Sequence, residues 1–340
     1  MDIGKLIFNV AVLFVMMLPG VILKKCRMCP DGFGKGISNL VLYIAQPALV
    51  VYAYISASVT FADIWQNALW VLALSIVAHA LFAVVAMNLF KKAPDARQRM
   101  LRFATIFSNA AFMGIPLVEA AIGAEAAIYA SIYNITFNFF LWTLGVHLCT
   151  RIHGEDLDGD GDSDMRDAHL SARKHIKKAN SFIKVLLHPV TLASAIGVLL
   201  LVFGINVPVM EGAGLKLVSD SLYMLKSLVA PLSMVVIGLR LVDVDFRGIF
   251  KDLHMYLFLA LRHFLLPLAV LGICELLQLF LPSLTDSAEL IIIIMAATPA
   301  ATSSTMFAEM YDCDAAYVSR LVVVSTILCI ATMPLVVMLV

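Results

Sequence analysis

Long apolar stretches follow one another along the whole chain and define its expected architecture. Each is about 20 residues long, the length that a helix needs to cross the ~30 Å hydrocarbon core of a bilayer. Short polar segments separate them, except for one longer polar segment at 150–181. The pattern predicts ten membrane-spanning helices. Their expected ranges are Leu6–Leu23, Ile37–Ile55, Ile64–Phe90, Leu101–Ala121, Ala124–Cys149, Phe182–Gly204, Ser219–Val242, Leu253–Phe280, Ala288–Glu309 and Tyr317–Val340.

Two of these expected helices, Leu101–Ala121 and Ala288–Glu309, contain proline near the middle. Proline removes one backbone hydrogen bond and clashes with the preceding turn. In lipid, the freed carbonyls must find partners within the protein or in a water-filled cavity. We therefore expect both helices to be broken, the first close to Pro116 and the second at Thr298–Pro299.

The prolines also indicate an internal repeat. Pro47 and Pro116 are 69 residues apart, and Pro231 and Pro299 are 68 apart. Each half of the chain has five expected helices, an odd number, so the second half enters the membrane in the opposite sense. The predicted fold is an all-α membrane protein with ten transmembrane helices, arranged as a 5+5 inverted repeat with two broken crossing helices. The expected units are a first repeat at 1–149, a cytosolic central loop at 150–181 and a second repeat at 182–340.

Composition supports a membrane protein, and charge position orients it. The chain is 61% hydrophobic and 14% charged, with a mean hydropathy of +0.94. Nineteen of the 24 lysines and arginines lie in the loops after expected helices one, three, five and seven, or at their edges. This places those loops in the cytosol and both termini outside, in a multi-pass protein of the cell membrane. The net charge is zero, and we expect the lipid bilayer, and no nucleic acid, as a partner.

The two breaks predict a binding site. Proline fits the first position of a helix, because its missing N–H costs nothing there. Two second half-helices starting at the prolines would point their positive N-terminal ends at the membrane midplane, which suits an anion. Thr298 is expected to cap one of them, whereas Ile115 cannot cap the other and leaves its donors free. The alternative is a packed kink whose serines and threonines bond back to carbonyls.

The candidate substrate-binding residues come from the breaks and from one neighbouring helix, where Asn138 either lines the same cavity or makes a helix–helix hydrogen bond. They are Ser108, Asn109, Gly114, Ile115, Pro116, Asn138, Thr298, Pro299, Thr302 and Ser303. Arg262 and Glu119 are candidates for ion coupling. A charge inside a membrane helix is costly and often functional, but Arg262 could instead snorkel to the surface and Glu119 could simply be interfacial.

An acidic run in the central loop has the spacing of a calcium loop. Its candidate ligands are Asp156, Asp158, Asp160, Asp162, Asp164 and Asp167, with Gly161 at the sixth position. Asp167 replaces the usual glutamate at position twelve, which is expected to weaken binding. The alternative is a solvated linker facing the basic run at 173–178. Apart from calcium at this loop, no cofactor is expected.

Three motifs carry a resemblance to a known family. The segments Ser108–Leu117, Ala297–Ser304 and Glu309–Tyr311 resemble the auxin efflux carrier family, which includes plant auxin carriers and bacterial malate or malonate permeases. The resemblance implies a fold similar to sodium/proton antiporters and bile acid symporters, with scaffold and crossover domains each drawn from both repeats. Asn109 matches the asparagine that contacts the substrate carboxylate in plant members. The short central loop, and the lack of an asparagine near the second break, place the chain closer to the bacterial permeases.

Together these features predict a secondary transporter of a small organic anion, a mono- or dicarboxylate, working by alternating access. The alternative is a membrane receptor or sensor that binds the anion without moving it. No nucleophile–base or metal-protease motif is present, so no enzymatic activity is expected. The sequence leaves the oligomeric state open, a homodimer included.

Overall fold

The computed structural model describes residues 3–30, 32–56, 60–93, 95–150, 187–203, 213–244, 252–280, 285–311 and 313–340. Within these ranges the chain is helical, apart from one isolated β-bridge. In the first half the helices are α1 (Ile3–Val15), α2 (Leu18–Lys25), α3 (Phe33–Leu40), α4 (Gln46–Ile55), α5 (Phe61–Leu89), α6 (Asp95–Ile106), α7 (Ile115–Ile122), α8 (Ala126–Phe140) and α9 (Val146–Thr150). In the second half they are α11 (Pro189–Val202), α12 (Ala213–Ser227), α13 (Val229–Leu241), α14 (Leu253–Ala260), α15 (Leu266–Phe280), α16 (Asp286–Ala297), α17 (Ser303–Met310) and α18 (Ala315–Val337).

Six helical stretches in the described ranges are long and apolar enough to cross a membrane. They are Ile7–Lys25, Phe33–Ile55, Ala62–Leu89, Lys216–Leu241, Leu253–Phe280 and Ala315–Val337. Large apolar side chains such as Phe8, Leu253 and Leu279 stay more than 60% exposed, as suits a surface solvated by lipid. The prediction of a multi-pass helical membrane protein is confirmed, whereas the count of ten and the 5+5 inverted repeat stay predictions. The acidic run at 156–167 lies outside the described residues.

In the described ranges, four helices contain a π-helical turn, and three of these turns precede a proline. The turns are Val41–Ala45, Ala110–Gly114, Leu141–Gly145 and Leu261–Leu265. Pro47, Pro116 and Pro267 each follow the last residue of a turn by two positions. Proline donates no N–H and crowds the carbonyl four residues before it, so the preceding turn widens. The widened turns change the direction of the side chains around them, and such turns are frequent at functional sites.

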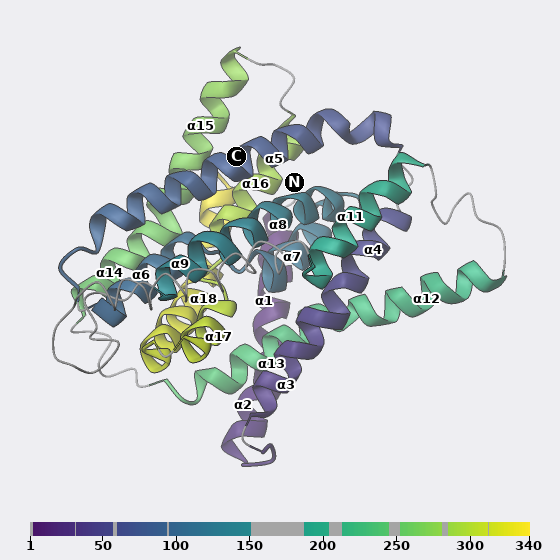
Figure 1. Cartoon of the computed structure of the whole chain (residues 1–340). Coiled ribbons are helices and arrows are strands. Elements are labelled where there is room, and N and C mark those ends of the chain that lie inside the picture. Colours follow the sequence, from purple (N-terminus) through teal and green to yellow (C-terminus); the bar gives the residue numbers. More distant parts are fainter. Residues whose placement is uncertain are drawn as a thin grey trace, which may run out of the picture.

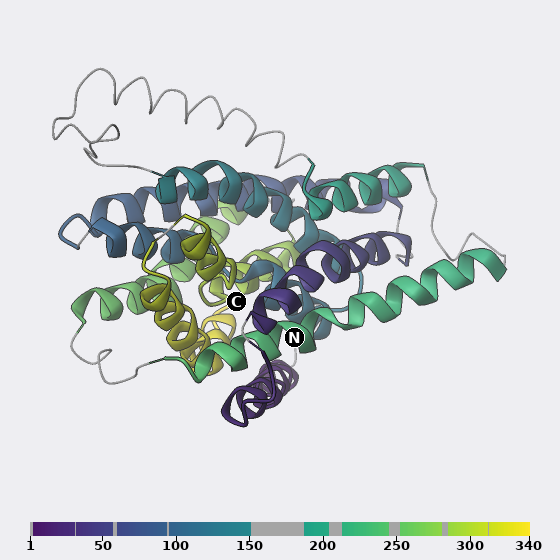
Figure 2. The same ribbon diagram turned by 60° about the horizontal axis from the view of Figure 1, so that its bottom comes forward.

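Glycines let two of the helices pack backbone to backbone. A Cβ added to Gly20 in α2 would lie 2.1 Å from the carbonyl oxygen of Val235 in α13. One added to Gly238 would lie 2.1 Å from the Met17 oxygen. Close approach through small residues is a main source of helix association in membranes. With α4 packed between α11 and α12, these helices form one group, seen on the right and lower side of Figures 1 and 2.

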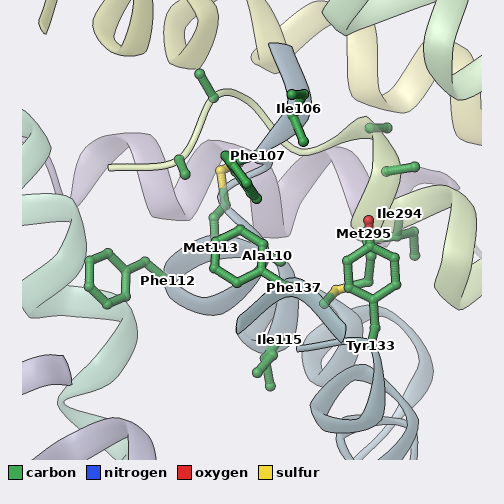
Figure 3. Close-up of a cluster of buried hydrophobic side chains, with 14 of the residues drawn as sticks. Ile106, Phe107, Ala110, Phe112, Met113, Ile115, Tyr133, Phe137, Ile294 and Met295 are labelled. Atoms are coloured by element: carbon green, nitrogen blue, oxygen red, sulfur yellow. The ribbon is translucent and has the colours of Figure 1, made fainter. Parts of the chain in front are cut away.

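The other group brings together the interrupted helices and their neighbours α5, α8, α14, α15 and α18. Figure 3 shows its buried apolar centre, in which Phe107, Met113 and Phe137 gather around the interruption between α6 and α7. Gly114 lies so close to Met295 of α16 that an added Cβ would be 2.7 Å from the Met295 sulfur. The predicted candidate Gly114 is therefore a packing residue at the contact of the two interrupted helices.

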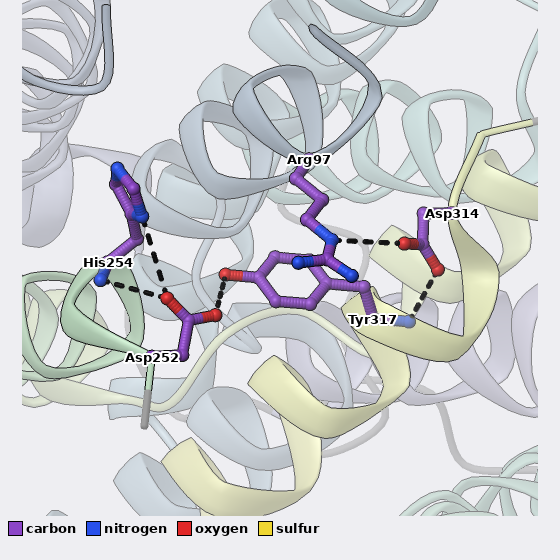
Figure 4. Close-up of polar contacts among 5 residues, drawn as sticks. All are labelled: Arg97, Asp252, His254, Asp314 and Tyr317. Carbon is purple, nitrogen blue, oxygen red and sulfur yellow. Dashed lines mark hydrogen bonds and ion pairs between the residues drawn. The ribbon is translucent and has the colours of Figure 1, made fainter. Parts of the chain in front are cut away.

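Polar contacts join the starts of α6, α14 and α18 at one end of this group (Figure 4). The Tyr317 hydroxyl donates to Asp252 Oδ2 at 2.8 Å, and Asp252 Oδ1 accepts from the His254 N–H at 3.0 Å. Asp314 caps α18 by accepting from the Tyr317 N–H at 2.9 Å and pairs with Arg97 Nε at 3.5 Å. Carboxylates at helix N-termini satisfy free N–H groups. All three starts lie next to loops that the sequence predicts to be cytosolic.

Candidate functional site

The two interrupted helices cross through extended segments. The Asn109 N–H donates to the Pro299 carbonyl at 2.7 Å, and the Ala301 N–H donates to the Phe107 carbonyl at 2.9 Å. These bonds form an antiparallel bridge between Ser108 and Ala300. The bridge satisfies backbone groups that the breaks release, as a membrane interior requires. We call this region, residues 107–109 and 298–302, the crossing.

The helices that leave the crossing begin at positions other than the prolines. A π-helical turn from Ala110 precedes Pro116 without interruption, so the first of them begins at Ala110 with Asn109 as its N-cap. The second begins at Ser303 with Thr302 as its N-cap, and Pro299 lies in the extended segment. The prediction that the half-helices start at the prolines is therefore wrong by about one turn each.

Two related predictions also change. Ile115 does not precede a half-helix whose first-turn donors are left free, because the helix already runs through it and its own N–H bonds to the Ala110 carbonyl. Thr298 does not cap the following helix. It is the C-cap of α16, and its hydroxyl donates back to the Met295 carbonyl at 2.8 Å. Ile115 thus makes an ordinary hydrogen bond within its helix, and Thr298 ends α16.

The two N-cap side chains bond to each other. Thr302 Oγ1 donates to Asn109 Oδ1 at 2.9 Å, and both residues are 3% exposed. Asn109 Nδ2 has no hydrogen-bond partner among the described residues. An N–H donor therefore remains at the point where two helix N-termini meet, beside the backbone N–H groups that a first helical turn cannot satisfy.

A narrow cavity opens beside these N-termini. Four predicted site residues line it: Ser108, Asn109, Asn138 and Ser303. The rest of its wall is Leu42, Gln46, Ala111, Phe112, Phe137, Leu141, Trp142, His188, Ala301, Met306 and Phe307. Its empty volume, including the space at its open side, is about 440 Å³, but only a water-sized body fits between the walls in this conformation. The described wall contains no Asp, Glu, Lys or Arg.

Several polar atoms of this region are buried and have no hydrogen-bond partner within the described part of the chain. They include both amide atoms of Gln46, Asn109 Nδ2 and the hydroxyl of Ser303, with those of Ser304 and Thr305 one and two residues later. Each such atom costs about 1–3 kcal/mol of stability when nothing satisfies it. Unsatisfied buried polar groups are rare in proteins and call for an explanation at each position. Of these residues, Gln46, Asn109 and Ser303 line the cavity, where a ligand could satisfy them.

The opposite ends of the interrupted helices are closed by one side chain. Arg262, fully buried on the π-helical turn between α14 and α15, donates from Nε and Nη2 to the Thr298 carbonyl at 3.1 and 2.9 Å. It also donates to the Ala296 carbonyl at 2.9 Å and to the Thr105 carbonyl at 3.1 Å. These carbonyls end α16 and α6, where helix dipoles are negative. Arg262 does not snorkel. It holds the two C-terminal ends together.

A neutral histidine supports the crossing next to Arg262. The Ala300 N–H donates to the Ser325 hydroxyl at 3.0 Å, which in turn lies 2.9 Å from His263 Nε2. Thr332 donates to the Leu328 carbonyl, so it accepts from His263 Nδ1 at 2.9 Å. In this arrangement of donors and acceptors, the ring proton lies on Nδ1, and Nε2 accepts a hydrogen bond from the Ser325 hydroxyl.

Glu119 lies away from the cavity, near the end of α7. It forms an ion pair with Lys226 of α12, and the Lys226 ammonium lies 4.6 Å from the centre of the Tyr52 ring. The pair is partly buried, with side-chain exposures of 11% for Lys226 and 26% for Glu119. It joins a helix of the crossing to the other helix group. Its predicted part in ion coupling stays a prediction.

Gln46 and His188 are wall residues that sequence reasoning missed. Gln46 directly precedes Pro47, which was singled out only as a repeat marker. A polar residue beside a proline inside an apolar span was the available signal. His188 follows the central loop, and its place in the wall depends on tertiary packing against Tyr43 and Trp142. No local pattern predicts that contact.

A second hollow lies beside the cavity, next to the loop after the first expected helix, which the sequence predicts to be cytosolic. Lys24, Lys35, Arg240 and Asp243 line it, together with residues 29–34 except 31, Ser38, Leu239 and Met306. Met306 belongs to the walls of both hollows. We call the second hollow the basic vestibule. Arg240 Nη1 also donates to the Thr302 carbonyl at 3.2 Å, which joins the vestibule to the crossing.

A search among curated proteins finds no match to this chain. A family model described as membrane transport protein matches residues 5–337, nearly the full length. Both interrupted helices, the cavity and the vestibule fall within the matched region. The chain therefore belongs to this family of transporters rather than enzymes, the membrane transport proteins of the auxin efflux carrier type.

Proposed function

We propose that this protein is a secondary transporter of small organic anions, mono- or dicarboxylates, and that it binds the carboxylate at the N-terminal side of the crossing. The observation that carries the proposal is an asymmetry of charge. At the negative helix ends the chain supplies its own cation, Arg262. At the positive ends, Ala110 and Ser303, the described cavity wall supplies no carboxylate.

The physical reason is the dipole of the two helices. Each N-terminus carries roughly half an elementary charge and several N–H donors without partners. Anions bind at such ends without a formal positive charge. Asn109 Nδ2 and the Ser303 hydroxyl add two donors for which the described residues supply no partner. A carboxylate offers two oxygens with about four acceptor positions, enough to engage this set.

The basic vestibule supports an anionic substrate and a route to it. Lys24, Lys35 and Arg240 give it positive charge, and Asp243 pairs with Lys24 at 3.2 Å. A cleft lined mostly by one sign of charge raises the local concentration of ions of opposite sign. Met306 separates the vestibule from the cavity, so movement of this flexible side chain would connect them.

Alternating access is the mechanism that we propose for release on the other side. The crossing helices α6, α7, α16 and α17 would move against the group that contains α2, α4, α11, α12 and α13. The narrow cavity fits a state in which neither side is fully open. A 5+5 inverted repeat would give the protein two related arrangements for this movement.

Two measurements on the purified full-length protein distinguish a transporter from a receptor that only binds the anion. Thermal-shift screening with short carboxylates identifies a ligand, and uptake of that ligand is then measured in proteoliposomes. We expect both binding and flux, and both should fall in Asn109→Ala but not in Ser221→Ala, a hydroxyl deletion on the exposed face of α12. Binding without flux would assign the protein to the receptors, and no carboxylate binding would exclude the proposed site.

The proposed orientation has both termini outside the cell membrane. Cysteines introduced near Asp63 and Asp286 should react with an impermeant thiol reagent added to intact cells, because the basic loops lie on the other side. The native exposed Cys26 should react only after the cells are opened. Labelling of Cys26 from outside would invert the orientation and place the basic vestibule outside.

A further inference from the structure

We propose that Gln46 binds a second, neutral polar group of the substrate, so that the transported species is a monoanion with a carboxylate at one end and a neutral carboxyl or carboxamide at the other. The half-protonated form of a short dicarboxylate is the simplest example. This inference rests on the proposed function and specifies its substrate.

The first observation is the state of the Gln46 side chain. It is 1% exposed, and neither Oε1 nor Nε2 has a hydrogen-bond partner among the described residues. The residue lines the same cavity as Asn109 and Ser303, but from α4, in the other helix group. The π-helical turn Val41–Ala45 and Pro47 fix the backbone on both sides of it. A buried amide with both functions unused is costly, and the cavity is the place where a ligand could use them.

The second observation limits the charge of the ligand. Two helix N-termini of roughly half a charge each offset about one negative charge. The described cavity wall adds no Lys or Arg, and Arg240 lines the vestibule and donates to the Thr302 carbonyl. A second full negative charge in this cavity would be buried without a partner, which is strongly unfavourable. The cavity therefore fits a monoanion.

The chemistry of an amide then defines the second group. Gln46 Nε2 donates and Oε1 accepts, so the best partner accepts and donates at adjacent atoms. A neutral carboxyl does this through its C=O and O–H, and a carboxamide through its C=O and N–H. An ionised carboxylate can only accept, which would leave Oε1 facing a negative charge. For a dicarboxylate, the bound proton then stays on the substrate, and one proton enters with each monoanion.

His188 is the titratable side chain in the described wall, and its hydrogen bond indicates a neutral ring. Its Nδ1 accepts from the Val190 N–H at 3.4 Å, so that nitrogen carries no proton. The ring packs against Tyr43 and Trp142, with centroids 6.0 and 5.9 Å away. A ligand that does not titrate separates any effect of His188 from protonation of the substrate.

The test uses three ligands of similar size on the full-length protein in detergent. Succinamate carries a carboxylate and an amide at every relevant pH, succinate changes from monoanion to dianion, and butyrate lacks the second group. By isothermal titration we expect succinamate to bind about 10–100-fold more tightly than butyrate, from hydrogen bonds to an otherwise unsatisfied amide. Succinate should match succinamate near its second pKa and weaken about tenfold for each pH unit above it, while succinamate stays constant.

Two variants show which residue is responsible. In Gln46→Met, succinamate and succinate should fall to the affinity of butyrate, and butyrate should change less than about threefold. In Asn109→Ala all three ligands should weaken together. Equal binding of succinamate and butyrate by the parent protein, or tighter binding of the succinate dianion, would overturn the inference and leave the carboxylate site intact. Failure of all three ligands to bind would instead contradict the proposed function.

Discussion

The two sides of the crossing differ in how their polar groups are satisfied. On the C-terminal side, the carbonyls of Thr105, Ala296 and Thr298 converge on one buried guanidinium. On the N-terminal side, the donors of Asn109 and Ser303 lie at a cavity and find no partner in the part of the chain that the structure describes. The chain thus supplies a cation to the negative helix ends, whereas the described cavity wall supplies no anion to the positive ends. This difference is what supports the proposal that a ligand binds on the N-terminal side.

The chain itself holds the crossing together. The two extended segments share bridge hydrogen bonds, and Arg262 bonds to both helices that enter the crossing. The cost on the N-terminal side is limited to a few unsatisfied donors, about 1–3 kcal/mol each. In the proposed site, a bound anion would satisfy those donors, so it would stabilise the crossing.

The largest expected effect follows removal of Arg262. In Arg262→Met, several buried carbonyls and two negative helix ends lose their donor, and we expect a loss of more than about 3 kcal/mol of stability. The melting temperature in detergent should fall sharply, and Arg262→Lys should lie between, because an ammonium keeps the charge but not the fork of donors. A variant with an unchanged melting temperature and no ligand binding would show instead that Arg262 contacts the substrate.

The next effect concerns the N-terminal side of the crossing. Asn109→Ala removes one donor to the anion and should weaken carboxylate binding about 10–100-fold, as expected for a hydrogen bond to a charged group. Asn109→Asp should weaken it further, because it places negative charge at two helix N-termini where the substrate carboxylate belongs. Both variants should keep a melting temperature close to that of the parent. Titration and thermal unfolding of the same samples measure the two quantities, and unchanged affinity in Asn109→Ala would remove this residue from the site.

Smaller effects are expected when threonine is replaced by valine on either side of the crossing. Thr302→Val removes the hydroxyl that donates to Asn109 Oδ1 and should weaken binding about 3–10-fold, because the amide loses its fixed orientation. Thr298→Val removes a hydroxyl that donates to the Met295 carbonyl and should cost about 1 kcal/mol of stability without changing affinity. The opposite outcome, with affinity lost in Thr298→Val alone, would show that the two sides have been assigned the wrong roles.

The sequence predicted the features that depend on local chemistry. Asn109 and Ser303 are polar residues inside apolar spans, and proline at the breaks implied interrupted helices that the structure contains. The predicted first residues of the two half-helices were wrong because the prediction placed proline at the first position of each. Near Pro116 the helix instead widens into a π-helical turn, and at Pro299 the chain pairs with the other break. That pairing depends on residues almost 200 positions apart, so no local rule could supply it.

The role of Arg262 shows a second limit of sequence reasoning. A charged residue in a membrane helix indicated function or snorkelling, because a single sequence does not show which carbonyls lie nearby. Its partners come from α6 and α16, at separations of 34 to 157 residues. Gln46 was not predicted as a site residue for a different reason. Its importance follows from hydrogen bonds that it does not make, and only three-dimensional packing shows those.

The smallest expected effect concerns the ion pair outside the crossing. Glu119→Gln and Lys226→Met each remove one partner of this partly buried pair, which should lower the melting temperature slightly. A double-mutant cycle should show that the two changes are not additive, because the second removes a partner already lost. Ligand affinity should stay constant in all three variants, since the pair does not line the cavity. Uptake into proteoliposomes with and without a pH gradient then tests ion coupling. If Glu119→Gln binds normally but no longer responds to the gradient, Glu119 carries the coupled proton. If the variant keeps the response, the pair only connects α7 to α12, and the protons that enter are those carried by the substrate itself.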